Sequence, residues 1–145
     1  MARKIYIFLA VIALILLDQL SKHFMQGANW EIIPDIASFH YTTNSGAAFG
    51  MMQGWNFIFV VASIIIAAII LWHFEDLGSE IGALLLVSGA IGNLIDRIFF
   101  GFVRDFISIS IWPTFNLADS FGVIGVLLIA LHSFKIKYFK KANGQ

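Results

Sequence analysis

The sequence predicts an all-α membrane protein, with four transmembrane helices and a small β element in the loop between the first two. Hydrophobic residues make up 59% of the 145 residues and charged residues only 12%, whereas soluble domains are about 25% charged. The mean hydropathy is +0.86, and the apolar residues gather in stretches of about 20, which is enough to cross a bilayer as a helix. This length leaves no room for a soluble domain, so residues 1–145 are predicted to form a single integral-membrane domain.

Four apolar stretches have the length of a span. The predicted spans cover about residues 5–25, 55–74, 81–100 and 117–134. The first follows a basic head, a pattern that is also typical of a cleaved secretory signal peptide. Asp18 and Lys22 follow the apolar run directly and no small-x-small cleavage site is present, which favours a retained span. Trp55 and Trp72 lie near the ends of the second stretch, as interfacial aromatic residues do.

Two segments outside the spans have the character of strands. The loop 26–54 contains I-A-S-F-H-Y-T-T with partial alternation, which predicts a small β element at the membrane surface. Residues 105–112, D-F-I-S-I-S-I-W, alternate and predict a short strand or a segment lying in the interface. Pro113 is predicted to break this segment, and Asp119 or Ser120 to cap the fourth helix.

The basic residues predict the orientation. Six of the nine Lys and Arg residues lie in the two tails: Arg3, Lys4, Lys135, Lys137, Lys140 and Lys141. Cytoplasmic loops and tails carry the excess of positive charge, so both termini are predicted to be cytoplasmic, which requires an even number of spans. The polar residues of the spans and loops then gather near the outer leaflet. Arg97 and Arg104 are expected to pair with acids in that layer.

Charged and amide side chains within so apolar a chain require partners or a wet cavity. Asp18 and Lys22 are four residues apart and can pair on one helix face, or can merely end the first span near headgroups. Asn93, Asp96 and Arg97 share a face of the third span and are predicted to form a buried polar clamp. Gly89 and Gly92 precede them, where small residues allow another backbone to approach.

Asp105 and Asp119 are the candidates for chemistry. One follows the third span and the other begins the fourth, so they can face each other at one depth. Two close carboxylates share a proton and can activate water and protonate a leaving amine. The alternative is that each is a helix cap or an Arg partner. A further run, Asn44 to Gly50, can be an ordinary turn or can present backbone N–H groups to an extended peptide.

Five motifs carry a resemblance to a family. They are D-Q-L-S-K (18–22), N-S-G-A-A-F (44–49), G-N-L-I-D-R (92–97), V-R-D-F (103–106) and F-N-L-A-D (115–119). With these five motifs in this order, the chain resembles bacterial lipoprotein signal peptidase, also called signal peptidase II. The resemblance implies an aspartic endopeptidase of the bacterial inner membrane, with its active site near the outer, periplasmic face. Such an enzyme removes the signal peptide from diacylglyceryl-modified prolipoproteins, cutting just before the lipidated Cys.

The resemblance also implies roles for individual residues. Asp105 and Asp119 correspond to the catalytic pair. The supporting or substrate-binding positions are Asp18, Lys22, Asn44, Gly46, Asn93, Asp96, Arg97 and Asn116. No metal or other cofactor is implied; the partners are lipid-modified prolipoproteins and membrane lipids, and the enzyme is expected to be monomeric. Two residues depart from the family pattern: Ser88 stands where a second glycine is common, and Arg104 where an apolar residue is. Arg104 is expected to alter the charge balance of the pair or to contact lipid phosphate.

Other functions make different predictions. A small proton- or ion-coupled transporter would place acids near the midplane and show an internal repeat, and the sequence shows neither. A metal-dependent hydrolase would use Asp and Asn oxygens as ligands. A structural or assembly protein would not need the aspartate pair. The formal net charge of zero gives no indication of nucleic-acid binding.

Overall fold

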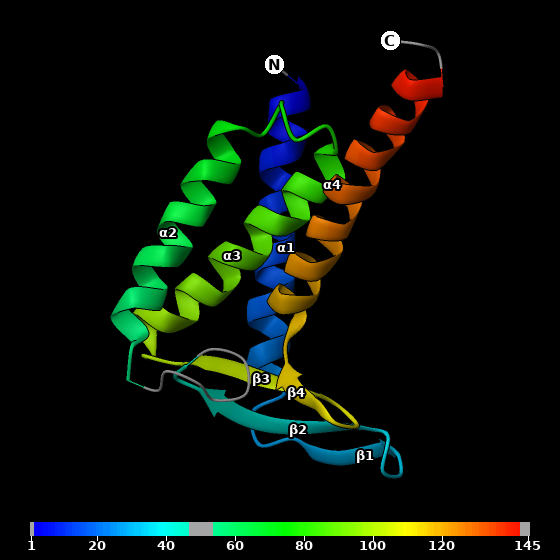
Figure 1. The fold of residues 1–145 in the computed structure, drawn as a ribbon. Coiled ribbons are helices and arrows are strands. Elements are labelled where there is room, and N and C mark those ends of the chain that lie inside the picture. Colours follow the sequence, from blue (N-terminus) through cyan, green and yellow to red (C-terminus); the bar gives the residue numbers. More distant parts are fainter. Residues whose placement is uncertain (1, 47–53, 143–145) are drawn as a thin grey trace.

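The computed structural model describes residues 2–46 and 54–142, with side chains to residue 136. Four helices run up and down, and both ends of the chain lie at the end of the bundle away from a small sheet (Figure 1). The helices are α1 (Ala2–Phe24), α2 (Asn56–Trp72), α3 (Glu80–Phe99) and α4 (Leu117–Ala142). Each corresponds to a predicted span. Over Ala2–Phe24, Glu80–Phe99 and Leu117–Ile136 the helices are long and apolar enough to cross a membrane, whereas α2, with 17 residues, is apolar but shorter.

The central helix is α3, which packs against the other three helices. Small residues allow this packing. A Cβ on Gly89 would lie 2.3 Å from the carbonyl oxygen of Ala118 in α4, and a Cβ on Gly92 would lie 2.7 Å from a carboxylate oxygen of Asp18 in α1. The predicted approach of another backbone is therefore confirmed at Gly89, whereas at Gly92 the neighbouring atoms belong to side chains. The hydroxyl of Ser79 accepts a hydrogen bond from the Gly82 N–H and caps the start of the helix.

The sheet has four antiparallel strands in the order β1-β2-β3-β4. They are β1 (Asn29–Ile33), β2 (Ala37–Asn44), β3 (Val103–Ile109) and β4 (Trp112–Phe115). The prediction of a β element in the 26–54 loop is confirmed but incomplete, because half of the sheet comes from residues 103–115. The prediction that Pro113 ends the second segment is wrong. The chain turns at Ser110, with φ of 45°, and Pro113 lies inside β4, an edge strand where a missing N–H is tolerated.

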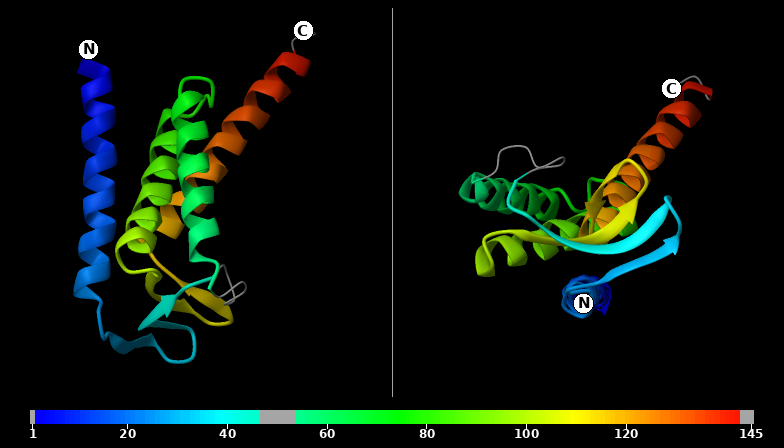
Figure 2. Two further views of the ribbon diagram at one scale, coloured as in Figure 1. Left: turned by 90° about the vertical axis from the view of Figure 1, so that its left-hand side faces the viewer. Right: turned by 90° about the horizontal axis from the view of Figure 1, so that it is seen from below.

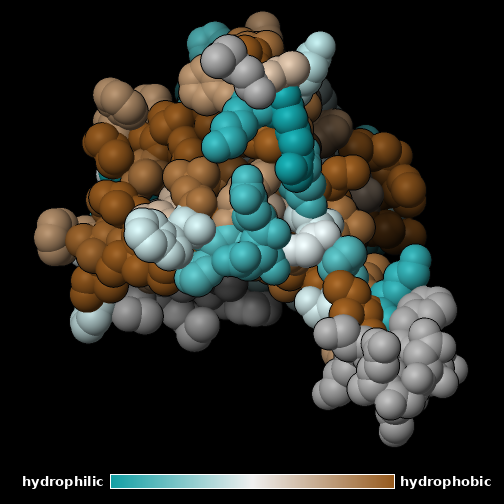
Figure 3. Space-filling model, turned by 90° about the horizontal axis from the view of Figure 1, so that it is seen from above, coloured by the Kyte–Doolittle hydropathy of each residue, from teal (hydrophilic) through white to brown (hydrophobic). Residues whose placement is uncertain are grey.

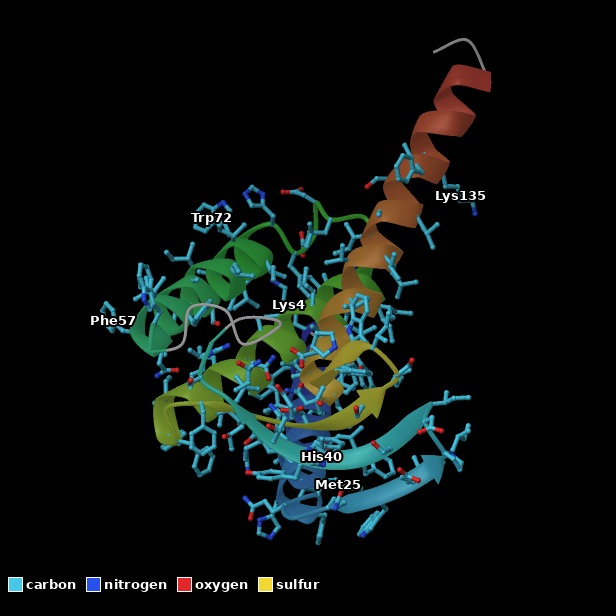
Figure 4. The ribbon with its side chains drawn as sticks, turned by 60° about the horizontal axis from the view of Figure 1, so that its bottom comes forward. Lys4, Met25, His40, Phe57, Trp72 and Lys135 are labelled. Atoms are coloured by element: carbon cyan, nitrogen blue, oxygen red, sulfur yellow. The ribbon has the colours of Figure 1, made fainter. Side chains whose placement is uncertain are left out.

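The sheet lies across the ends of the helices, and its two hairpins project to one side (Figures 1 and 2). Apolar side chains cover the outside of the bundle; Phe57 and Trp72 point away from α2 (Figure 4), and each is more than three-quarters exposed. Seen from the end that carries the termini, hydrophilic residues form a central band with hydrophobic residues around it (Figure 3). An apolar flank of this kind is the surface that a lipid-embedded bundle presents.

Candidate active site

Asp105 and Asp119 come from different elements and line one cavity. Asp105 lies in β3, and Asp119 is the third residue of α4. The cavity holds about 250 Å³ and lies where the sheet meets the ends of α3 and α4. Its remaining lining residues are Asn44, Gly46, Asn93, Arg97, Val103, Trp112, Pro113, Thr114 and Phe115. The structure therefore brings together the two predicted carboxylates and four of the predicted supporting residues.

Asn116 joins the two carboxylates. Its side-chain Nδ2 donates to Oδ1 of Asp105 at 2.7 Å, and its backbone N–H donates to Oδ2 of Asp119 at 3.1 Å. The backbone N–H of Asp119 donates in return to Oδ1 of Asn116 at 2.9 Å. This reciprocal pair is a capping box, so Asn116 caps α4, and the prediction of Asp119 or Ser120 as the cap is wrong. Asn caps a helix as well as Asp does, and its amide is left to hold Asp105.

Asn93 holds Asp119 from the side of α3. Its Nδ2 donates to Oδ1 of Asp119 at 2.8 Å. Its Oδ1 accepts from Nζ of Lys22 at 3.0 Å and from Nδ2 of Asn116 at 3.1 Å. Because one end of the amide faces donors and the other faces a carboxylate, the orientation of Asn93 is fixed, and with it the position of Asp119.

Behind the cavity lies a cluster of buried charges. The side chains of Asp18, Lys22 and Asp96 are fully buried, and Lys22 Nζ lies 2.8 Å from Asp18 Oδ2 and 3.3 Å from Asp96 Oδ2. Asp18 also accepts the backbone N–H of Ala118 at 2.9 Å, at the start of α4. The predicted ion pair of Asp18 and Lys22 is confirmed, and the alternative of a pair among headgroups is wrong. Buried charges persist only when paired, and here they join α1, α3 and α4.

The two arginines behave differently. Arg104 is 4% exposed, lies 2.7 Å from Asp96 Oδ1 and stacks over the Phe100 ring. Its predicted pairing with an acid is therefore confirmed, and the prediction of a lipid phosphate contact is wrong.

Arg97 pairs with no carboxylate among the described residues, contrary to the prediction. Its guanidinium donates to the Gly46 carbonyl at 3.1 Å and lies over the Phe59 ring. Arg97 is one residue beyond Asp96, about 100° further round the helix, and therefore faces the cavity and α2.

The end of β2 forms one wall of the cavity. The N–H of Gly46 donates to Oδ1 of Asn44 at 3.0 Å, which fixes a tight turn after the strand. Together with the contact from Arg97, this places both residues at the cavity. The rest of the predicted N-S-G-A-A-F motif, residues 47–49, lies outside the described residues.

The environment of Asp105 suits proton transfer. Burial, and after it the charge of Asp119, raises the pKa of Asp105 from 3.8 to about 7, against the opposing effect of the Asn116 amide and the Lys22 charge. A carboxyl with such a pKa can be protonated or ionised at neutral pH and can therefore give or take a proton. Within residues 2–46 and 54–142, no three His, Asp or Glu side chains are placed to hold a metal ion.

Gln19 is a site residue that the sequence did not single out. Its Oε1 accepts from Arg104 at 2.8 Å, and its Nε2 donates to the Gly92 carbonyl at 3.0 Å and to Asp96 Oδ1 at 3.2 Å. It thus joins α1, α3 and β3. The one signal that could have found it is its place beside Asp18, as a second polar residue at the end of an apolar span. Figure 4 shows the oxygen and nitrogen atoms gathered between the helix ends and the sheet.

Fold and site together define a helical membrane protein with a carboxylate pair at one end of its bundle. A family model described as Signal peptidase (SPase) II matches residues 10–135. The lipoprotein signal peptidase of Halothermothrix orenii is 38% identical over 87% of this chain and 93% of its own, and that of Moorella thermoacetica is 39% identical over 86% and 89%. A solved bacterial membrane enzyme superposes with a TM-score of 0.83 at 31% identity, covering 97% of this chain and 92% of its own.

The chain therefore belongs to the signal peptidase II family of membrane peptidases. A second solved bacterial membrane enzyme agrees, with a TM-score of 0.76 at 33% identity over 87% of this chain and 90% of its own. The transporter alternative finds no support in these comparisons.

Proposed function

We propose that this peptidase is an aspartic endopeptidase that removes the signal peptide from diacylglyceryl-modified prolipoproteins, cutting just before the lipidated Cys. Family membership supports the removal of signal peptides from prolipoproteins. The observation that supports the aspartic mechanism is the convergence of Asp105 and Asp119 on one cavity, joined through Asn116. No metal ion or other cofactor is needed for this chemistry.

The two carboxylates act on water and on the peptide bond in turn. One ionised carboxylate takes a proton from water, and the resulting nucleophile attacks the scissile carbonyl carbon. The other, protonated carboxyl polarises that carbonyl and then gives its proton to the nitrogen of the lipidated Cys as the C–N bond breaks. The raised pKa of Asp105, about 7, allows a single proton to be held by the pair near neutral pH.

An apolar groove leads from the cavity along the helices and supports a place for the signal peptide. The groove holds about 580 Å³ and shares Asn93, Arg97 and Asp119 with the cavity. Its other walls include Phe59 and Ile66 from α2 and side chains of α3 and α4 that are mostly small or aliphatic. An apolar signal helix lying here brings its carboxyl end to the aspartates, while the lipid chains on the Cys stay in the outer leaflet.

The arrangement of the chain supports four spans, with both termini cytoplasmic and the site near the outer face of the bacterial inner membrane. The termini lie at the end of the bundle opposite the sheet, and the basic tails favour the cytoplasm (Figure 1). Helix α2 has 17 residues, so it is about 26 Å long and reaches the lower limit of a span. Residues 1–145 then form a single domain, which acts as a monomer.

The test is cleavage of a purified, diacylglyceryl-modified prolipoprotein by the purified protein in lipid. We expect cleavage that persists in the presence of a chelator and is lost in Asp105→Asn and Asp119→Asn. Loss of cleavage with the chelator would instead support the metal-dependent hydrolase. Cleavage of unmodified precursor at the same rate would contradict the lipid-modified substrate, and absence of cleavage by the native protein would contradict the proposal as a whole.

A further inference from the structure

We propose that Arg104 is a positioning residue for the reaction: it fixes the backbone that carries Asp105, and it supplies the counter-charge that keeps the buried ion cluster neutral. This inference rests on the proposed role of Asp105. Arg104 is one of the two residues at which this chain departs from the family pattern. Among the described residues, it is the one buried charged residue that is not a predicted site residue.

Arg104 and Asp96 contact each other three times. Nη2 of Arg104 lies 2.7 Å from Oδ1 of Asp96, Nε lies 3.3 Å from Oδ2, and the Arg104 backbone N–H donates to Oδ2 at 2.9 Å. Nη2 also donates to Gln19. A guanidinium presents several donors in one plane and can hold both oxygens of a carboxylate, which a Lys ammonium cannot do in this geometry.

These contacts fix the strand immediately before Asp105. The Arg104 N–H is held by Asp96, and the Arg104 carbonyl accepts from Nδ2 of Asn116 at 3.4 Å. The same Asn116 nitrogen holds Asp105 Oδ1 at 2.7 Å. Both backbone polar groups of residue 104 are therefore engaged, and the carboxylate that follows is aimed into the cavity.

The charges of the cluster balance only when Arg104 is counted. Asp18 and Asp96 are the acids, and Lys22 and Arg104 are the bases. Without Arg104, Lys22 would be the single counter-ion of two fully buried carboxylates, and one negative charge behind the aspartate pair would be uncompensated. The other charged groups that line the cavity with Asp105 are Asp119 from α4 and Arg97 from α3, and Tyr41 from β2 faces Arg104 and Asp96. Among the described residues, the bases within 4.0 Å of a carboxylate oxygen of Asp96 are Lys22 and Arg104.

This charge balance makes a specific prediction for the pH dependence of cleavage. Arg104→Met adds a net negative charge, so proton release from the pair becomes harder and the acidic limb of the kcat/KM profile moves up by about half a pH unit or more. Asp96→Asn leaves a net positive charge and moves the limb down. The double variant carries no net change, and its limb returns close to that of the native protein. Arg104→Lys keeps the limb but lowers kcat, because the charge remains and the two-oxygen contact is lost.

The experiment measures the full pH profile of these four variants with diacylglyceryl-modified prolipoprotein. A carbon-13 NMR titration of Asp105, assigned by its loss in Asp105→Asn, follows the same shifts without any turnover. Asp96→Asn keeps the side-chain volume, so it tests the charge balance from the opposite side if Arg104→Met does not fold. An identical limb and titration in all variants, with only kcat reduced, would overturn the charge role of Arg104. Turnover retained by Asp105→Asn would instead overturn the proposed function, and the titration would still decide the inference.

Discussion

Replacing either aspartate by asparagine tests the proposed mechanism, and the structure predicts that the two variants differ in stability. Asn keeps the shape of Asp but can neither take a proton from water nor give one to an amine. General acid–base catalysis contributes about 10²–10⁴-fold per group, so each variant should lose at least that much kcat. The pair acts as a unit, so the double variant should be little worse than either single one.

The contacts of the two carboxylates set the stability expected of each variant. Asp119 accepts hydrogen bonds at both oxygens, from Asn93 and from the Asn116 backbone, and asparagine can accept at only one. Asp119→Asn should therefore lose about 1–2 kcal/mol in the free energy of unfolding, since one donor is left unpaired. Asp105 accepts from the Asn116 side chain at Oδ1, and asparagine can keep that bond. Asp105→Asn should be no less stable than the native protein at neutral pH.

The pH dependence of stability provides the matching control for Asp105. Its pKa is raised from 3.8 to about 7 in the folded protein, so the folded state holds the proton more tightly than the unfolded state. Its contribution to stability is therefore fully present below about pH 4 and is lost as the pH rises through about 7. Asp105→Asn should remove this part of the pH dependence. The assay is cleavage of lipid-modified precursor together with thermal unfolding in lipid between pH 4 and 8. Substantial turnover by either purified variant would refute the two-aspartate mechanism.

Four further predictions concern topology, the buried cluster, Arg97 and the helix packing. Reporter fusions should place the C-terminal part of α4, which begins with Lys135, in the cytoplasm; an outside location would contradict the four-span topology. Asp96→Ala should lower both the melting temperature and the activity. The free energy of unfolding should fall by about 3–5 kcal/mol, because the variant leaves buried bases without their carboxylate partner. Arg97→Ala should also lower both; variants that keep full stability and lose only turnover would place these residues in the catalytic machinery. Gly89→Ala should destabilise the bundle because its Cβ would meet a backbone oxygen of α4, whereas Gly122→Ala, with nothing within 4 Å, is the control; equal melting temperatures would refute this packing argument.

The sequence predicts the four helices because each is a continuous apolar stretch, and that signal is local. The sheet is harder to predict, because β2 and β3 pair across an intervening helical hairpin. Alternation in residues 105–112 indicated a strand, but its partner could not be read from the segment itself. Pro113 was expected to end the strand, since the edge position that tolerates it depends on the order of the whole sheet.

The candidate site shows the same division. Spacing predicted that Asp18 pairs with Lys22, because four residues on a helix share a face. Spacing could not predict that Arg97 and Arg104 have different partners, since both are basic residues beside acids. Arg97 faces the cavity because of its angular position on α3, and Arg104 reaches Asp96 because of its position in β3. The N-cap was assigned to the wrong residues for a related reason. Asn116 and Asp119 are both good capping types, and their roles follow from where α4 begins.

Stability and catalysis are connected in this protein through the side chains between the buried cluster and the cavity. The two acids that face the cavity are linked to the buried cluster behind it through amide side chains. Asn93 contacts both Lys22 of the cluster and Asp119, and Asn116 contacts both Asp119 and Asp105. A change in the charge of the buried cluster therefore reaches the aspartate pair through fixed side chains and not only through space. For this reason a stability measurement alone cannot distinguish a supporting residue from a structural one here. The position of the acidic limb of the pH profile can, because a purely structural loss lowers the rate without moving the pH at which the pair ionises.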